Sequence, residues 1–182
     1  MKVADILKIA CQMTGNDDLA DKLEGSLTDE EESRKQLLLD ALNLVISEVG
    51  CEYMPILVEE EFEVKNFKID FADFTSAPLD IYAVKDRYGR AVKYRKYSSY
   101  IMAFSSKVKI TYSIMPSKVG LNDNISQINL PERVLAYGTA REYFLHQNLE
   151  GEAQIWEEKF KSSLENLLRR KSVLVLPKRR WI

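Results

Sequence analysis

Hydrophobic residues near the start of the chain recur at the spacing of amphipathic helices. The first stripe predicts a helix that stops at Gly15 and comprises Val3, Ile6, Leu7, Ala10 and Met13. Thr28 and Glu31 have the spacing of a capping box, which predicts the start of a longer helix. That helix should run to Val49 and end at Gly50, with a stripe of Leu38, Ala41, Leu42, Val45 and Val49. We therefore expect residues 1–54 to be helical.

The periodicity changes to strict alternation after Pro55. Val58, Phe62 and Val64 alternate with glutamates, which predicts a half-buried strand with an acidic face: Glu59, Glu61 and Glu63. A strand over 79–84, a turn at Gly89 and a returning strand over 92–97 predict a hairpin. Residues 107–114 alternate again. Residues 55–116 are thus predicted to form a small antiparallel β domain inserted between helices, with all four glutamates of this strand, Glu60 included, on an edge or open face.

Helical spacing returns in the last third of the chain. A polar loop over 117–130 precedes Pro131, which is typical of a first helical turn. We expect a helix pair over 131–171, with Gly138 allowing close helix packing and a final helix that buries Ala153, Trp156, Phe160, Leu164 and Leu167. The predicted fold class is therefore α+β: a helical bundle from both ends of the sequence, an inserted antiparallel β domain, and an extended arm over residues 172–182.

Composition removes several classes of enzyme. Hydrophobic residues make up 46% and charged residues 30% of the 182 residues, as in globular proteins. The single histidine, His146, excludes a multi-histidine metal site within one chain, and the glycines form neither a dinucleotide fingerprint nor a P-loop. We expect no enzyme activity, no cofactor and no metal. No apolar run approaches the length of a membrane span, so no membrane partner is expected.

The two cysteines, Cys11 and Cys51, lie in predicted helical surroundings. We interpret them as buried free thiols in a reducing compartment, with a disulfide between them as the alternative.

Charge is distributed unevenly along the chain. Residues 1–64 contain 5 lysines and arginines against 16 aspartates and glutamates, whereas residues 65–182 contain 21 against 12. A chain polarised in this way can stack head to tail with copies of itself or present its basic part to an acidic partner. The alternative is two solvated faces of opposite sign on one globule.

Residues 82–100 interleave tyrosines with lysines and arginines, as in proteins that bind single-stranded nucleic acid. Strand alternation divides the rings between two faces, which argues against a stacking platform. The candidate DNA-facing cations are Lys93, Arg95, Lys107 and Lys109. A DNA-binding or packaging-related protein that uses this face is the alternative function.

Residues 172–182, which we call the arm, have the sequence Ser-Val-Leu-Val-Leu-Pro-Lys-Arg-Arg-Trp-Ile. Aliphatic residues favour a strand, Pro177 prevents continuation of the helix, and cations with an aromatic ring follow. The arm either folds back on its own sheet or docks in another chain by strand addition with Trp181 as anchor. Its candidate partner-binding residues are Val173, Val175, Lys178, Arg179, Arg180, Trp181 and Ile182.

The order of these features resembles the head-to-tail adaptor (connector, or neck) proteins of tailed bacteriophages. The resembling segments span nearly the whole chain and are 42–45 (Leu-Asn-Leu-Val), 53–55 (Tyr-Met-Pro), 136–138 (Ala-Tyr-Gly), 142–143 (Glu-Tyr), 151–153 (Gly-Glu-Ala) with Trp156 and Phe160, and 178–182 (Lys-Arg-Arg-Trp-Ile). The predicted sheet is larger than in the most compact members of the family.

The resemblance implies a structural role in the virion neck. Adaptors have no active site and assemble as rings, commonly of twelve copies, between the portal and the tail. The implied partners are the portal protein, neighbouring copies, a tail-side neck or tail terminator protein, and DNA that passes through without specific recognition. The implied location is the virion, after assembly in the host bacterial cytoplasm. On this basis the arm is expected to bind the portal or a neighbouring copy.

Overall fold

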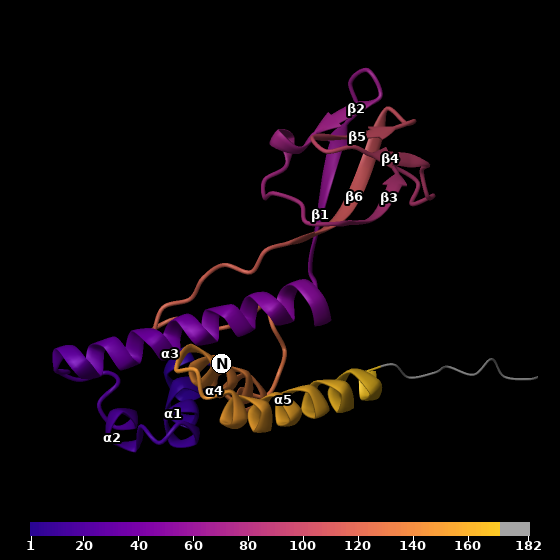
Figure 1. Cartoon of the computed structure of the whole chain (residues 1–182). Coiled ribbons are helices and arrows are strands. Elements are labelled where there is room, and N and C mark those ends of the chain that lie inside the picture. Colours follow the sequence, from indigo (N-terminus) through magenta and orange to yellow (C-terminus); the bar gives the residue numbers. More distant parts are fainter. Residues whose placement is uncertain (172–182) are drawn as a thin grey trace, which may run out of the picture. The chain divides into compact units, whose positions relative to one another are not determined.

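A computed structural model of the protein describes residues 1–171, and the arm lies outside the described residues. The fold is an α+β mix with an inserted small β domain, as predicted (Figure 1). The elements in chain order are α1 (Val3–Met13), α2 (Asp17–Ala20), α3 (Asp29–Glu48), a π-helical turn (Val49–Tyr53), β1 (Ile56–Glu63), β2 (Lys68–Asp70), a 3-10 turn (Phe71–Asp73), β3 (Ile81–Asp86), β4 (Tyr94–Lys96), β5 (Tyr100–Ala103), β6 (Lys107–Ile114), α4 (Glu132–His146) and α5 (Glu150–Lys171).

The described chain divides into two units, and the boundary falls within α3. One unit, the helical unit, contains residues 1–45, 119–125 and the chain from 129 onward. The other, the β unit, contains residues 46–118 and 126–128. Among residues 1–171, no helix combines the length and the apolar composition needed to cross a lipid bilayer.

The helical unit is built around close packing of α1 on α4 and of α4 on α5. Gly138 lies where α4 approaches its neighbours: a Cβ atom there would lie 2.7 Å from Cγ1 of Val45 and 3.1 Å from the Phe160 ring. This confirms the predicted role of Gly138 in close packing, because no larger residue fits that separation without displacing a side chain.

Buried polar groups also join the helices of this unit. Arg141 of α4 forms ion pairs with Glu142 at 2.5 Å and with Glu157 of α5 at 2.7 Å, and its guanidinium lies 5.1 Å from the centre of the Phe160 ring. Because Arg141 is 7% exposed, its charge requires these carboxylates.

The capping box at the start of α3 is present as predicted. The backbone amide of Thr28 donates to Oε2 of Glu31 at 2.9 Å, and the amide of Glu31 donates back to the Thr28 hydroxyl at 3.3 Å. The α-helix ends at Glu48, one residue before the predicted end at Val49, but Gly50 does not stop the helical chain, which continues through the π-helical turn to Tyr53. A Cβ atom at Gly50 would lie 2.3 Å from Cγ of Pro116, so this glycine allows close packing within the β unit.

The β unit contains two three-stranded antiparallel sheets, with strand orders β1-β6-β3 and β2-β5-β4 (Figure 1). Residues from both sheets form one apolar core that includes Ile69, Val84, Ile101, Ile110 and Tyr112. The ring of Phe74, in the loop between β2 and β3, packs on the first sheet, with its centroid 4.4 Å from that of Phe62 and 4.9 Å from that of Tyr112.

The predicted hairpin over 79–97 is only partly formed. Residues near Gly89 turn as expected, and the amide of Val92 donates to the carbonyl of Val84 at 2.9 Å. Residues 94–96 then leave β3 and pair with β5 in the second sheet. The prediction failed because β2 and β5 are short, three and four residues, and their alternation is too brief to be detected in the sequence.

Candidate functional site

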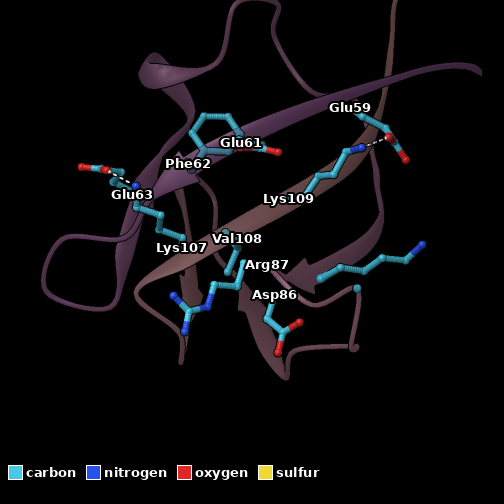
Figure 2. Close-up of a pocket in the computed structure, with 11 residues that line it drawn as sticks. Glu59, Glu61, Phe62, Glu63, Asp86, Arg87, Lys107, Val108 and Lys109 are labelled. Carbon is cyan, nitrogen blue, oxygen red and sulfur yellow. Dashed lines mark ion pairs between the residues drawn. The ribbon is translucent and has the colours of Figure 1, made fainter.

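The open face of the β1-β6-β3 sheet carries rows of opposite charge. Side chains of β1 alternate between half-buried and exposed, which places Glu59, Glu61 and Glu63 on the solvent side. The central strand β6 presents Lys107 and Lys109 on the same side. The strand alternation read from the sequence therefore matches the structure of β1 and β6, and these residues line a shallow hollow of about 600 Å³ (Figure 2).

Two ion pairs cross the face from β1 to β6 (Figure 2). Lys109 contacts Glu59 at 2.5 Å, and Lys107 contacts Glu63 at 2.7 Å. Hydrogen bonds from these lysines hold the pKa of Glu59 and of Glu63 below their ordinary value. The reciprocal contacts raise the pKa of Lys107 and Lys109. Both pairs are solvent-exposed, so they organise the face more than they stabilise the fold.

Glu61 lies between these pairs and differs from its neighbours. It is exposed and directly opposite Lys109 in the register, yet that lysine contacts Glu59 instead. Within the described part of the chain, no ion pair or hydrogen bond to the Glu61 carboxylate is present. The middle carboxylate of the acidic row therefore lacks a direct ion-pair partner, although its charge contributes to the raised pKa of Lys107 and Lys109.

Glu60 was expected on an edge or open face with the other glutamates, and this expectation is wrong. Strand alternation turns Glu60 toward the half-buried side of β1, where its carboxylate accepts from the Thr75 amide at 3.3 Å. Burial alone would raise the pKa of Glu60, but hydrogen bonding from Thr75 holds it below its ordinary value. A carboxyl group in this state stays ionised at neutral pH and lacks the raised pKa of a general acid.

The candidate DNA-facing cations do not form one surface. Lys107 and Lys109 are ion-paired on the open face of the first sheet. Arg95 lies in β4 of the second sheet and Lys93 directly precedes that strand, and both side chains are exposed. The tyrosines are also divided. Tyr94 packs against the core, Tyr97 stacks on Tyr100 with centroids 4.5 Å apart, and Tyr82 and Tyr88 are exposed.

The end of the β unit where β1 gives way to β2 carries an exposed aromatic pair, which the sequence reading did not single out. Phe67 and Phe104 are 60% and 59% exposed, and their ring centroids are 5.8 Å apart. Asn66 and Phe67 both have left-handed backbone conformations, with φ of 52° and 61°. Two such residues form the tight turn of a hairpin, and asparagine is the usual signal for it.

The cysteines are free thiols, but only one is buried. Cys11 is fully buried in α1, and burial raises its pKa to about 11. Cys51 is exposed in the π-helical turn, so the expectation that both thiols are buried is wrong for this residue. The helical pattern assumed for residue 51 fails where the regular helix ends.

Metal-ligating side chains do not gather among residues 1–171. No cluster of three or more histidine, cysteine, aspartate or glutamate side chains in these residues is arranged to hold a metal ion. The described hollow on the β unit is open and lined by paired charges, which suits contact with another chain better than chemistry on a small molecule. The candidate partner-binding residues Val173, Val175, Lys178, Arg179, Arg180, Trp181 and Ile182 lie outside the described residues.

No protein-family model matches the sequence, and no curated protein matches it.

Proposed function

We propose that this chain is a structural virion protein, a head-to-tail adaptor that forms a ring between portal and tail through which DNA passes. The observation that carries the proposal is the architecture. An antiparallel β unit is inserted between helix α3 and the helix pair α4–α5, and a basic and aromatic arm follows α5 in the sequence. The same order of features characterises the adaptor family that the sequence resembles.

Two further observations support a role in assembly. The open face of the β unit has paired charges and no asymmetric carboxyl pair, as expected of a surface that meets protein rather than substrate. The division of acidic and basic residues along the chain suits heterologous contacts, in which each copy presents unlike surfaces to its two neighbours. The portal is the proposed partner on one side, and a tail-side neck or terminator protein is the partner on the other.

Mixing the purified chain with a portal ring tests the proposal. The expected result is a complex whose mass corresponds to a closed ring of adaptor copies on the portal, measured by native mass spectrometry and by imaging of the particle. An unchanged portal mass under these conditions would contradict the adaptor function.

Deleting residues 172–182 should leave a folded monomer that no longer joins portal-bearing heads. A full-length variant, Trp181→Ala, should weaken the association, because a central aromatic anchor contributes a large part of interface binding. Ile155→Ala is the matched control, since Ile155 is an exposed apolar residue of α5 outside the arm. If the truncated protein still assembled normally, the arm would have no part in the contact.

The alternative is a DNA-binding or packaging-related protein that uses residues 82–100. The exposure of Lys93 and Arg95, neither of which is ion-paired in the described residues, favours this alternative. It requires salt-dependent affinity of the isolated chain for DNA.

A further inference from the structure

The longest sheet edge in the described structure belongs to β1. This strand has eight residues and pairs with β6 along one side. On its other side, no backbone hydrogen bond to residues 56–63 is formed within residues 1–171. The nearby loop reaches β1 through the Thr75 amide and the Glu60 side chain rather than through the strand backbone. The outer edge of β1 therefore has backbone donors and acceptors available to another strand.

The two faces of β1 specify what kind of strand would fit this edge. On the open face the order along the strand is apolar first and acidic afterwards: Leu57, Glu59, Glu61 and Glu63. Leu57 is 51% exposed, which is unusual for a leucine in a sheet with a packed core. The opposite face is half-buried and largely apolar, with Ile56, Val58 and Phe62.

The arm has the complementary order in its sequence. In an extended strand, alternate residues share a face. One face of the arm would carry two leucines followed by two cations: Leu174, Leu176, Lys178 and Arg180. The other face would carry Val173, Val175, Arg179 and Trp181 around Pro177. Residues 173–180 number eight, the same as the residues of β1.

We propose that residues 173–181 of a neighbouring copy add as a parallel strand to the outer edge of β1. This inference rests on the proposed ring assembly and names the surface that receives the arm. A parallel alignment places Leu174 beside Leu57, Lys178 beside Glu61 and Arg180 beside Glu63. The same alignment places Leu176 beside Glu59. An antiparallel alignment that keeps Lys178 beside Glu61 would place Arg180 beside Glu59, but it would move Trp181 to Val58, away from the exposed pair of Phe67 and Phe104.

The parallel alignment gives the Glu61 carboxylate a direct ion-pair partner. Glu59 and Glu63 already contact lysines of β6, so Glu61 is the carboxylate of the row that is available to a cation of the added strand. On the other face, the arm valines lie beside Ile56 and Val58. Trp181 arrives at Val64, at the end of β1 where the exposed pair of Phe67 and Phe104 lies.

Charged edge residues also serve to keep strands from pairing, and the experiment separates that role from docking. The Cys51→Ser background removes the exposed thiol and leaves the buried Cys11. One chain then carries Glu61→Cys and a second, distinguished by a tag, carries Lys178→Cys. Adjacent strands bring Cα atoms within the range that a disulfide spans. Mixed under mild oxidation, with and without the portal ring, the two chains are expected to form a disulfide-linked heterodimer.

In the matched control, the first chain carries Arg90→Cys in place of Glu61→Cys. Arg90 is an exposed residue of the same unit on the β3 side. We expect at least about a tenfold higher yield of linked chains for position 61 than for position 90. Equal yields, or no link in either preparation, would overturn the inference. The strand direction is tested by Leu174→Cys, which should link to Leu57→Cys in preference to Glu63→Cys. The reverse preference would overturn the parallel alignment.

A chain that carries both Glu61→Cys and Lys178→Cys separates exchange between copies from folding back. Linked dimers and larger species support the inference, whereas a linked monomer with no larger species overturns it. Charge reversal provides a test without cysteines. Glu61→Lys and Lys178→Glu should each reduce the association of copies several-fold, and the double variant should restore it. Thermal unfolding of each variant verifies that the fold is retained.

The outcomes also distinguish the two proposals. Portal binding without a link between positions 61 and 178 contradicts strand exchange and leaves the adaptor function standing. A link without portal binding supports strand exchange and contradicts the adaptor function.

Discussion

At the scale of single residues, the acidic start of α3 is explained by local chemistry. Glu31 is 8% exposed and accepts from the Thr28 amide, while its other oxygen contacts Lys22 at 2.5 Å. The hydrogen bond from Lys22, followed by those from Thr28, lowers the pKa of Glu31 to about 2. This carboxylate therefore belongs to the helix start and the turn before it.

Stability should depend on the protonation of Glu31. Its pKa in the folded chain, about 2, lies below the ordinary value of 4.5. The unfolded chain therefore binds a proton first as the pH falls, and the stabilisation present above about pH 4.5 is lost progressively toward pH 2. We expect the free energy of unfolding to fall over this range, measured by denaturant titration at several pH values.

Glu31→Gln should flatten that pH dependence. Glu30→Gln is the matched control, because it removes the same charge one residue earlier on an exposed position. If both variants had the same pH profile, the cap would not be the source of the effect. Thr28→Ala should lower stability by about 1 kcal/mol through the loss of the helix cap.

At the scale of elements, glycine sets the distance between α4 and its neighbours in the helical unit. Gly138→Ala should destabilise the protein by about 1 kcal/mol, because the strain of overpacking against Val45 exceeds the gain in helix propensity. The measurement is chemical denaturation followed by circular dichroism.

Gly151→Ala is the control within α5. A Cβ atom there meets nothing within 4 Å, so the substitution should leave stability unchanged or raise it by up to about 1 kcal/mol. Combining Gly138→Ala with Val45→Ala should recover part of the overpacking strain, although Val45→Ala has its own packing cost. Equal effects at positions 138 and 151 would mean that close packing of α4 is unimportant.

Among the elements, long and strongly periodic ones were predicted well. The stripe of α1 and the alternating strands β1 and β6 match the sequence pattern, because each turns its apolar residues toward one side. In α5 the predicted stripe is buried at Ala153, Phe160 and Leu164, whereas Trp156 and Leu167 are only half-buried, so the prediction of burial is wrong for these two. The prediction was wrong for residues 92–97, where pairing with β5 replaced pairing with β3. Strand partners are chosen by contacts between distant segments, and a short strand carries too few residues to indicate its partner.

At the scale of the whole molecule, the distribution of cations predicts weak binding to DNA. Lys107 and Lys109 already contact carboxylates, and Lys93 and Arg95 lie on the other sheet. We expect the isolated chain to bind duplex DNA with a Kd weaker than about 100 μM at physiological salt. The measurement is fluorescence anisotropy over a series of salt concentrations.

Two paired variants refine this test. Lys107→Gln with Lys109→Gln should leave the weak affinity unchanged, since those cations are neutralised on the sheet. Lys93→Gln with Arg95→Gln is the comparison, because both side chains are exposed. The alternative function would be favoured if the unmodified chain bound DNA tightly with a steep salt dependence, and if Lys93→Gln with Arg95→Gln abolished that binding.

The candidate site shows the same division between what the sequence contains and what folding adds. The acidic row on β1 and the cationic arm can be read from alternation and composition, because both are local properties of the chain. The pairing of Glu59 and Glu63 with lysines, the isolation of Glu61 and the open outer edge of β1 depend on β6 being the neighbour of β1. No local pattern specifies that neighbour, since residues 56–63 and 107–114 are brought together only when the core between the two sheets closes.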